Sequence, residues 1–471
     1  MAVTENLWRW GVVEIVTAIR DGEVSSREVV EAHIQRIAMV NSSLNGVTRV
    51  LHDAALQAAD AADRIQASGA ALGSLHGVPF TVKENIDLAG SATTSGVVAL
   101  QNAVPAVDAP HVTQLKQAGA IPLARTNLPD FGFRWHTDNL LHGASVNPWD
   151  ATRTPGGSSG GDAIALATGM TPLGLGNDFG GSLRFPAQCC GIAALRPTHG
   201  RVPRGSALAP TEDPISFQLF AVHGPMARRV RDLRLALASM SAPDARDPWC
   251  VPAPLHGPAA ATPVKVAVCV DPGGGGVHPQ VAEGIRRAAH WLAESGYAVE
   301  EVELPAVAEA LETYMQIVAA DVRATMLPTV KTWASVDTQA FVDYFMQRMP
   351  ESSLQGYIQA LAGRNGIART WALFQREYPL ILGPVCTEPP FVLGFDVAGA
   401  ESVVSLMNSM RLSIAVNLLG LPAVAVPVGV ADGLPQGVQL IGAAYREDLC
   451  LQAAEQLERN VGPLTPIDPK A

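Results

Sequence analysis

Strand-like and helix-like segments alternate along nearly the whole 471-residue chain, and this alternation limits the folds open to it. Segment 25–41 starts with an S-x-x-E capping box and then has apolar residues at helical spacing, and an Ala-rich helical stretch follows at 53–67. Alternating apolar residues then predict a strand at 78–82, and the pattern repeats through the strand at 263–271 to the final helix at 447–460. Such alternation predicts a layered α/β fold.

The glycine-dense segment 155–191 is the main candidate for a catalytic site, because it holds two serines in glycine-rich loops. Ser158 lies in G-G-S-S-G-G and matches the G-x-S-x-G pattern of a nucleophile elbow. A Ser-His-Asp hydrolase also needs a downstream histidine, and no histidine follows His290. Taken alone, such a loop is more often a flexible turn before a helix or a backbone anion nest, and the phosphate-loop pattern G-x-x-x-x-G-K is absent.

Ser182 and Lys83 are the other two candidates. Ser182 follows two glycines, so neighbouring backbone N–H groups can converge on a tetrahedral oxyanion; a β-bulge with a solvated hydroxyl is the alternative. Lys83 directly follows the predicted strand 78–82, and its side chain should point to the face opposite the apolar residues of that strand. Desolvation there would turn its amine into a base, although a surface lysine is the commoner outcome.

The net charge and the cysteine content argue against several classes of function. A net charge of −11 and the lack of a basic run argue against a nucleic-acid partner. We expect no signal peptide, no membrane span, and a cytoplasmic location. The six cysteines form no C-x-x-C pair and H-E-x-x-H is absent, so we expect neither a metal nor another cofactor.

The motifs together resemble those of the amidase signature family, whose members include fatty acid amide hydrolase and the glutaminase subunit of tRNA-dependent amidotransferases. The resemblance extends over about residues 10–465 and is strongest in "PGGSSGGDAIALATGMTPLGLGNDFGGSLRFPAQCCG". "GVPFTVKENIDLAG", "ARTNLPDFG", "VNPWD" and "NLLGLPAVAVPVGVADGLPQGVQLIG" match further family blocks. The resemblance implies a single domain over 1–471, with a large mixed, mostly parallel central β-sheet covered by helices on both faces. Residues 306–380 would be a helical, variable region on the substrate side.

The resemblance also implies a Ser–cis-Ser–Lys triad. Ser182 would be the nucleophile, Ser158 the bridging serine with a cis peptide bond, and Lys83 the base. The resemblance assigns the remaining site residues to three groups: an oxyanion hole of Phe179, Gly180 and Gly181; polar supporting residues Ser159, Asp178 and Arg184; and a substrate cleft with Phe131, Gly132, Phe133, Arg134, Trp135 and Cys386. Two departures from the family pattern are Asn177, where many members have Thr or Ser, and the bulky Phe179.

By resemblance, the chain is a serine hydrolase that cleaves C–N bonds of amides and anilides through an acyl- or carbamoyl-enzyme, with carbamates (urethanes) and esters as further substrates. The aromatic cleft favours an uncharged aryl or acyl group. A glutamine-hydrolysing amidotransferase subunit that works with partner chains is the alternative, and a non-catalytic interaction protein fits the motifs less well. The expected partner is a small amide or carbamate, and a homodimer is left open.

Overall fold

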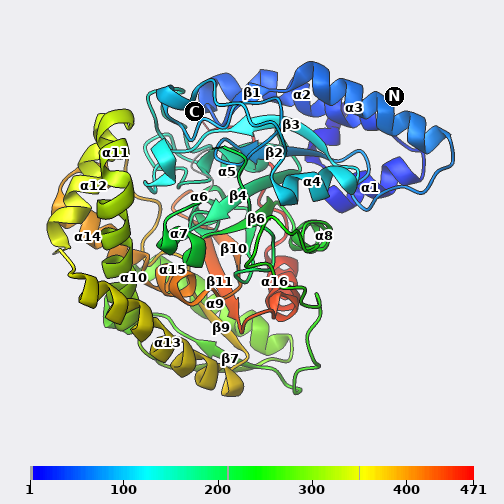
Figure 1. Ribbon diagram of the computed structural model, residues 1–471. Coiled ribbons are helices and arrows are strands. Elements are labelled where there is room, and N and C mark those ends of the chain that lie inside the picture. Colours follow the sequence, from blue (N-terminus) through cyan, green and yellow to red (C-terminus); the bar gives the residue numbers. More distant parts are fainter. Residues whose placement is uncertain (1–3, 209–211, 350, 471) are drawn as a thin grey trace.

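The computed structural model describes residues 4–208, 212–349 and 351–470, and these are arranged around one 11-stranded β-sheet (Figure 1). The strand order is β1-β3-β2-β4-β6-β5-β10-β11-β9-β7-β8. The strands are β1 Val47–Val50, β2 Pro79–Lys83, β3 Ile121–Thr126, β4 Leu173–Asp178, β5 Ala193–Arg196, β6 Val222–Ala227, β7 Lys265–Val268, β8 Ala298–Glu301, β9 Leu380–Pro384, β10 Ala423–Ala431 and β11 Leu434–Gly442.

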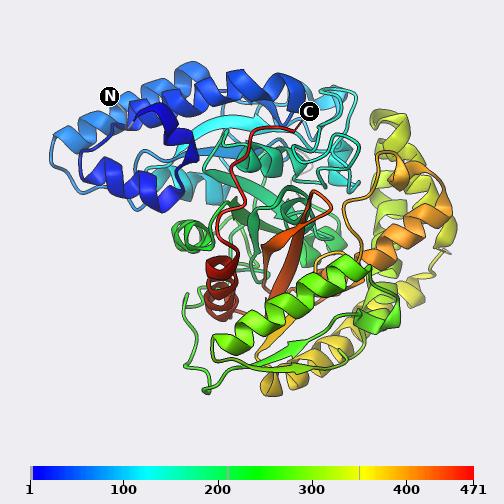
Figure 2. The same ribbon diagram turned by 180° about the vertical axis from the view of Figure 1, so that it is seen from behind.

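Helices cover both faces of this sheet (Figure 2). They are α1 Val12–Arg20, α2 Ser26–Leu44, α3 His52–Ala67, α4 Pro110–Gln117, α5 Gly160–Ala167, α6 Arg184–Cys190, α7 Ile215–Phe220, α8 Val230–Ser239, α9 Pro279–Glu294, α10 Val307–Asp321, α11 Leu327–Trp333, α12 Val336–Arg348, α13 Leu354–Glu377, α14 Ala400–Ser409, α15 Arg411–Leu419 and α16 Glu447–Val461. Short 3-10 or π turns lie at Thr4–Arg9, Val98–Leu100, Asp130–Gly132, Pro272–Gly274, Val322–Met326 and Phe395–Val397.

The alternation of side chains along each strand separates two apolar clusters. Phe80 and Val82 of β2 and Val426 of β10 belong to one cluster, which contains residues of α1, α4, α8, α9 and α16. Ala425 of β10 faces the other cluster, which contains residues of α5 and α15. Because every residue of β2 is buried, its last residue, Lys83, is enclosed as well. The α/β/α layering expected from the sequence is confirmed.

The expectation of a mostly parallel sheet is wrong. Among the strand pairings of the described residues, only β2–β3, β2–β4, β7–β8 and β7–β9 are parallel. β10 and β11 form a hairpin whose turn residues, Asp432 and Gly433, have φ of 47° and 80°, as a two-residue hairpin turn requires. This hairpin lies in the middle of the sheet and pairs antiparallel with β5 on one side and β9 on the other. An Asp-Gly pair between two strand-like runs is a sequence signal for this hairpin.

Several expected elements are present. α2 begins with the reciprocal capping box between Ser25 and Glu28, and β2, α5 and α16 lie where the patterns place them. The predicted helical region 306–380 forms α10–α13, which curve along one side of the molecule in Figure 1. Within the described residues, no single helix is long and apolar enough to span a membrane, although α14 and α15 meet that test when they are counted together across a 67° bend.

Candidate active site

Lys83 lies at the end of β2, between β3 and β4, with its side chain fully buried. Its Nζ contacts three oxygen atoms, the Ser158 Oγ at 2.7 Å, the Ser159 Oγ at 3.0 Å and the Asn177 Oδ1 at 2.7 Å. The first two belong to the loop before α5 and the third to the end of β4. The sheet and the glycine-rich loop therefore bring together a lysine and a serine that are far apart in the sequence.

Burial makes Lys83 a weaker base than a surface lysine. Loss of hydration lowers the pKa of Lys83 to about 7, although the negative charges of the Asp162 and Asp178 carboxylates act to raise it. Asp162 lies nearby and accepts hydrogen bonds from Thr81 and Thr126 at 2.8 and 2.7 Å, and burial raises its pKa above the ordinary value. Near neutral pH, a substantial fraction of Lys83 is thus an uncharged amine that can accept a proton.

The hydrogen bonds around Lys83 direct its lone pair. The Asn177 amide has its Nδ2 donating to the Asn85 Oδ1 at 2.9 Å, so its oxygen faces Lys83 as an acceptor. The Ser159 hydroxyl donates to the Asn177 carbonyl oxygen at 3.3 Å and is likewise left as an acceptor for Lys83. A neutral amine has two hydrogens and one lone pair. Once both hydrogens are donated to these acceptors, the lone pair faces Ser158.

The loop of Ser158 adjoins the loop of Ser182. The peptide bond between Gly157 and Ser158 is cis. The next residue, Ser159, donates its backbone N–H to the Ser182 carbonyl oxygen at 3.2 Å, so the two glycine-rich loops are held against each other. Ser182 itself is 6% exposed and lies between the end of β4 and the start of α6.

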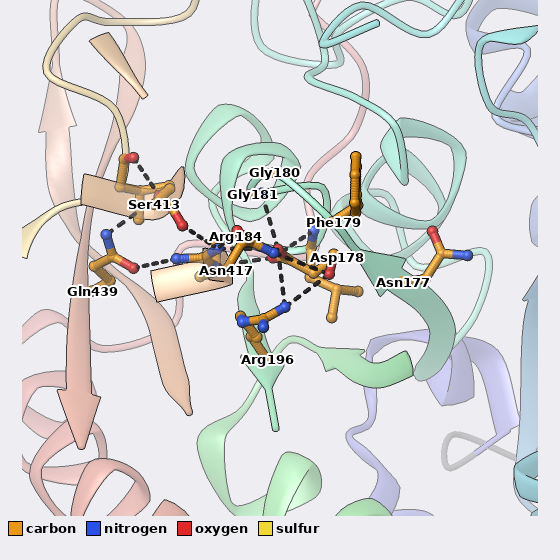
Figure 3. A network of polar contacts seen from close by, with 12 residues as sticks. Asn177, Asp178, Phe179, Gly180, Gly181, Arg184, Arg196, Ser413, Asn417 and Gln439 are labelled. Carbon is orange, nitrogen blue, oxygen red and sulfur yellow. Dashed lines mark hydrogen bonds and ion pairs between the residues drawn. The ribbon is translucent and has the colours of Figure 1, made fainter. Parts of the chain in front are cut away.

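Asp178 is the centre of a buried polar network (Figure 3). Both of its carboxylate oxygens accept hydrogen bonds from Arg184, at 3.0 Å each, and they also accept from the Gly181 and Leu183 amides and the Asn417 side chain. Although burial works to raise it, Arg184 and Arg196 hold the pKa of the Asp178 carboxyl below its ordinary range. The network fixes the backbone on both sides of Ser182.

The backbone before Ser182 contains N–H groups that can face an oxyanion. No acceptor among the described residues engages the amides of Phe179, Gly180 and Ser182, whereas the Gly181 amide donates to Asp178 at 2.9 Å. Gly181 has a φ of +100°, and a Cβ there would lie 2.5 Å from the Met410 Cε, so the position requires glycine. Of the three expected oxyanion-hole residues, Gly181 therefore has its amide committed elsewhere.

The expected cleft residues divide into two groups. Phe131, Gly132 and Phe133 are half-buried, and a Cβ on Gly132 would lie 3.2 Å from the Ser158 Oγ. Arg134, Trp135 and Cys386 are buried.

Each buried side chain of the second group is hydrogen-bonded to protein. Arg134 Nε donates to Asp396 at 2.8 Å, the Trp135 indole to the Gly180 carbonyl oxygen at 3.0 Å, and the Cys386 thiol to Ser409 at 3.4 Å. The guanidinium and the thiol are thus engaged with other residues of the protein.

Three aromatic residues that the motifs do not reveal pack against Phe179 and Phe133. Phe217 of α7 stacks on Phe179 with ring centroids 4.1 Å apart and contacts Phe133 edge-on at 6.4 Å. Phe220 and Tyr314 lie against the same cluster. No local pattern in the sequence points to them, because they reach the site only through the packing of α7 and α10.

Two further observations concern metal binding and cavities. Among the described residues, no group of three or more His, Cys, Asp or Glu side chains is arranged to hold a metal ion. A cavity of about 470 Å³ lies elsewhere, between α1, α8 and α16, and none of the residues described above lines it.

Comparison with known proteins finds similarity over most of the chain. The family model described as "Amidase" matches residues 28–451. The chain is 44% identical to an indoleacetamide hydrolase of Bradyrhizobium diazoefficiens over 97% of this chain and 88% of that protein. It is 32% identical to a glutamyl-tRNA(Gln) amidotransferase subunit of a Synechococcus species, over 94% of each chain. The crystal structure of a bacterial aryl acylamidase is similar, with a TM-score of 0.83, 27% identity and 96% of each chain covered.

Proposed function

This chain belongs to the amidase signature family of amide C–N hydrolases, and we propose that Ser182 is its nucleophile and that amides of aromatic acids are its substrates. The single observation that carries the proposal is the fully buried Lys83 Nζ lying 2.7 Å from the Ser158 Oγ, in the loop that adjoins Ser182. A buried amine beside a hydroxyl, in a loop hydrogen-bonded to the backbone of a second serine, supports nucleophilic catalysis without histidine.

In the proposed mechanism, protons move along the three side chains. The lone pair of neutral Lys83 takes the proton of Ser158, and Ser158 takes the proton of Ser182. The Ser182 oxygen attacks the amide carbonyl, and the Phe179, Gly180 and Ser182 amides bind the resulting oxyanion. The tetrahedral intermediate then collapses: the C–N bond breaks, Ser158 gives its proton to the departing nitrogen, and the Lys83 ammonium returns a proton to Ser158. Water hydrolyses the acyl-enzyme by the same relay.

The proposal of aromatic substrates depends on a cluster of phenylalanine rings near the two serine loops. Phe131, Phe133, Phe179 and Phe217 are half-buried and cluster beside the two serine loops. Partly exposed aromatic rings favour a flat apolar acyl group over a small ionic one. The similarity to an indoleacetamide hydrolase supports the same class.

An amidotransferase role would require recognition of the charged ends of glutamine. The one arginine in the expected cleft, Arg134, is buried and paired with Asp396, which favours an independent hydrolase. We extend the proposal to aryl carbamates, because formation of a carbamoyl-enzyme uses the same steps as formation of an acyl-enzyme.

A substrate panel tests this function. Indole-3-acetamide, phenylacetamide, a nitroanilide, an aryl carbamate and glutamine are compared with the wild-type enzyme and with Ser182→Ala. We expect turnover of the arylacetamides, little turnover of glutamine, and loss of all turnover in the variant. A fluorophosphonate adduct located by mass spectrometry should lie on Ser182. Undiminished amide hydrolysis by Ser182→Ala contradicts the assignment of the nucleophile, and a preference for glutamine contradicts the substrate class.

A further inference from the structure

We propose that Tyr314 and Trp135 are positioning residues that set the orientation of the oxyanion-hole backbone, so that the helical layer α10–α13 takes part in transition-state stabilisation. This inference rests on the proposed function of Ser182. Neither aromatic residue belongs to the glycine-rich motif, and each comes from a different part of the chain.

Tyr314 holds the peptide between Phe179 and Gly180. Its hydroxyl donates to the Phe179 carbonyl oxygen at 3.1 Å, and its ring packs against that of Phe179 with centroids 5.5 Å apart. In a planar trans peptide the C=O and the following N–H point in opposite directions. A carbonyl held by Tyr314 therefore directs the Gly180 N–H to the other side, and no acceptor among the described residues engages that N–H.

Trp135 holds the next peptide in the same way. Its indole Nε1–H donates to the Gly180 carbonyl oxygen at 3.0 Å. This bond acts on the same peptide plane whose N–H, that of Gly181, donates to Asp178 at 2.9 Å on the opposite side. The plane is thus held at both ends.

The Tyr314 and Trp135 side chains fill the space around Gly180. A Cβ on Gly180 would lie 3.3 Å from the Tyr314 hydroxyl and 3.5 Å from the Trp135 ring, so the two aromatic side chains enclose this residue. Glycine has more backbone freedom than any other residue, and two consecutive glycines before a nucleophile need external restraint. Both donors are buried, with 4% and 7% exposure.

The two donors connect the oxyanion hole to the helical layer. Tyr314 belongs to α10, and the Trp135 ring contacts Phe341 of α12 edge-on at 6.1 Å. A preorganised N–H stabilises the transition state more than the ground state, so its misplacement should lower kcat rather than weaken substrate binding. The inference therefore predicts a specific kinetic signature.

The test compares Tyr314→Phe with a matched control, Tyr357→Phe. Each variant removes one hydroxyl from the helical layer, but the Tyr357 hydroxyl donates to Asp321 at 2.8 Å and does not touch the oxyanion loop. With the amide hydrolysed fastest by the wild type, we expect Tyr314→Phe to lower kcat about tenfold and to change KM by less than about twofold. Trp135→Phe should show the same split, and Tyr357→Phe should leave kcat unchanged.

Inhibitor binding separates a positioning role from a loss of packing. Phenylacetaldehyde can form a tetrahedral adduct on Ser182, whereas phenylacetate mimics the product. Tyr314→Phe should weaken aldehyde inhibition by the same factor as kcat and leave inhibition by phenylacetate unchanged. An unchanged kcat in Tyr314→Phe, or equal weakening of both inhibitors, overturns the inference while leaving Ser182 as the nucleophile. A wild-type enzyme that hydrolyses no amide overturns the proposed function, and the inference with it.

Discussion

The most direct consequence of a buried Lys83 is a loss of activity in acid. Its pKa is lowered to about 7 by burial, and the proposed mechanism uses the neutral amine. Activity should thus be fully present above this pKa and fall as the pH drops through it. With one ionisation, kcat/KM should be about half of its plateau near pH 7 and roughly a tenth at pH 6. A lysine with the ordinary pKa of about 10.4 would instead give a rate that still rises beyond pH 9.

Asn177 offers a way to move this acid limb. In Asn177→Asp, a carboxylate oxygen replaces the amide oxygen that now lies 2.7 Å from the Lys83 Nζ. An opposite charge at such a distance raises the pKa of a lysine by roughly 1–3 units, because it favours the ammonium form. At pH 7 the neutral fraction should then fall from about one half to between roughly a tenth and a thousandth. Activity should recover in alkaline buffer.

The assay is kcat/KM for one arylacetamide between pH 5 and 10, measured for the wild type, Asn177→Asp and Asn177→Ser. The serine variant keeps a neutral oxygen, so its acid limb should stay close to that of the wild type. The circular dichroism of each variant over the same pH range checks that the fold persists. A wild-type profile that is flat between pH 5.5 and 8, or an acid limb that Asn177→Asp does not move upward, refutes the assignment of Lys83 as the base.

Two further predictions concern stability and specificity. Arg184→Met leaves the buried Asp178 carboxylate without its bidentate partner and should lower the free energy of unfolding in urea by about 3–5 kcal/mol. Arg231→Met, which removes an exposed ion pair with Glu14, should cost less than about 1 kcal/mol; equal losses in the two variants would contradict this view of the network. Phe217→Ala removes the ring stacked on Phe179 and should raise KM for arylacetamides roughly two- to tenfold, while KM for acetamide stays the same. An equal rise for both amides would show that Phe217 supports the fold rather than the aryl group.

Local patterns in the sequence predict much of the fold. The Ser25 capping box and the alternation at 78–82 each depend on residues only a few positions apart, and α2 and β2 are present as expected. The direction of the strands is predicted less well, because pairing depends on which distant strands meet. The exception is the Asp432–Gly433 turn, whose left-handed residues set the β10–β11 hairpin and could have been recognised from the sequence.

For the site, the residue types in the motifs determine the chemistry that is available, and the tertiary structure decides how it is arranged. Lys83, Ser158 and Ser182 can be picked out as the proposed base, bridge and nucleophile, because these roles need particular functional groups in particular local settings. No local signal in the sequence marks Asn177 as a hydrogen-bond acceptor for Lys83 or predicts the contact of Tyr314 with the Phe179 carbonyl oxygen. Both contacts arise only when β2, β4 and α10 pack together, since a contact between distant segments depends on the closure of the whole fold and not on neighbours along the chain.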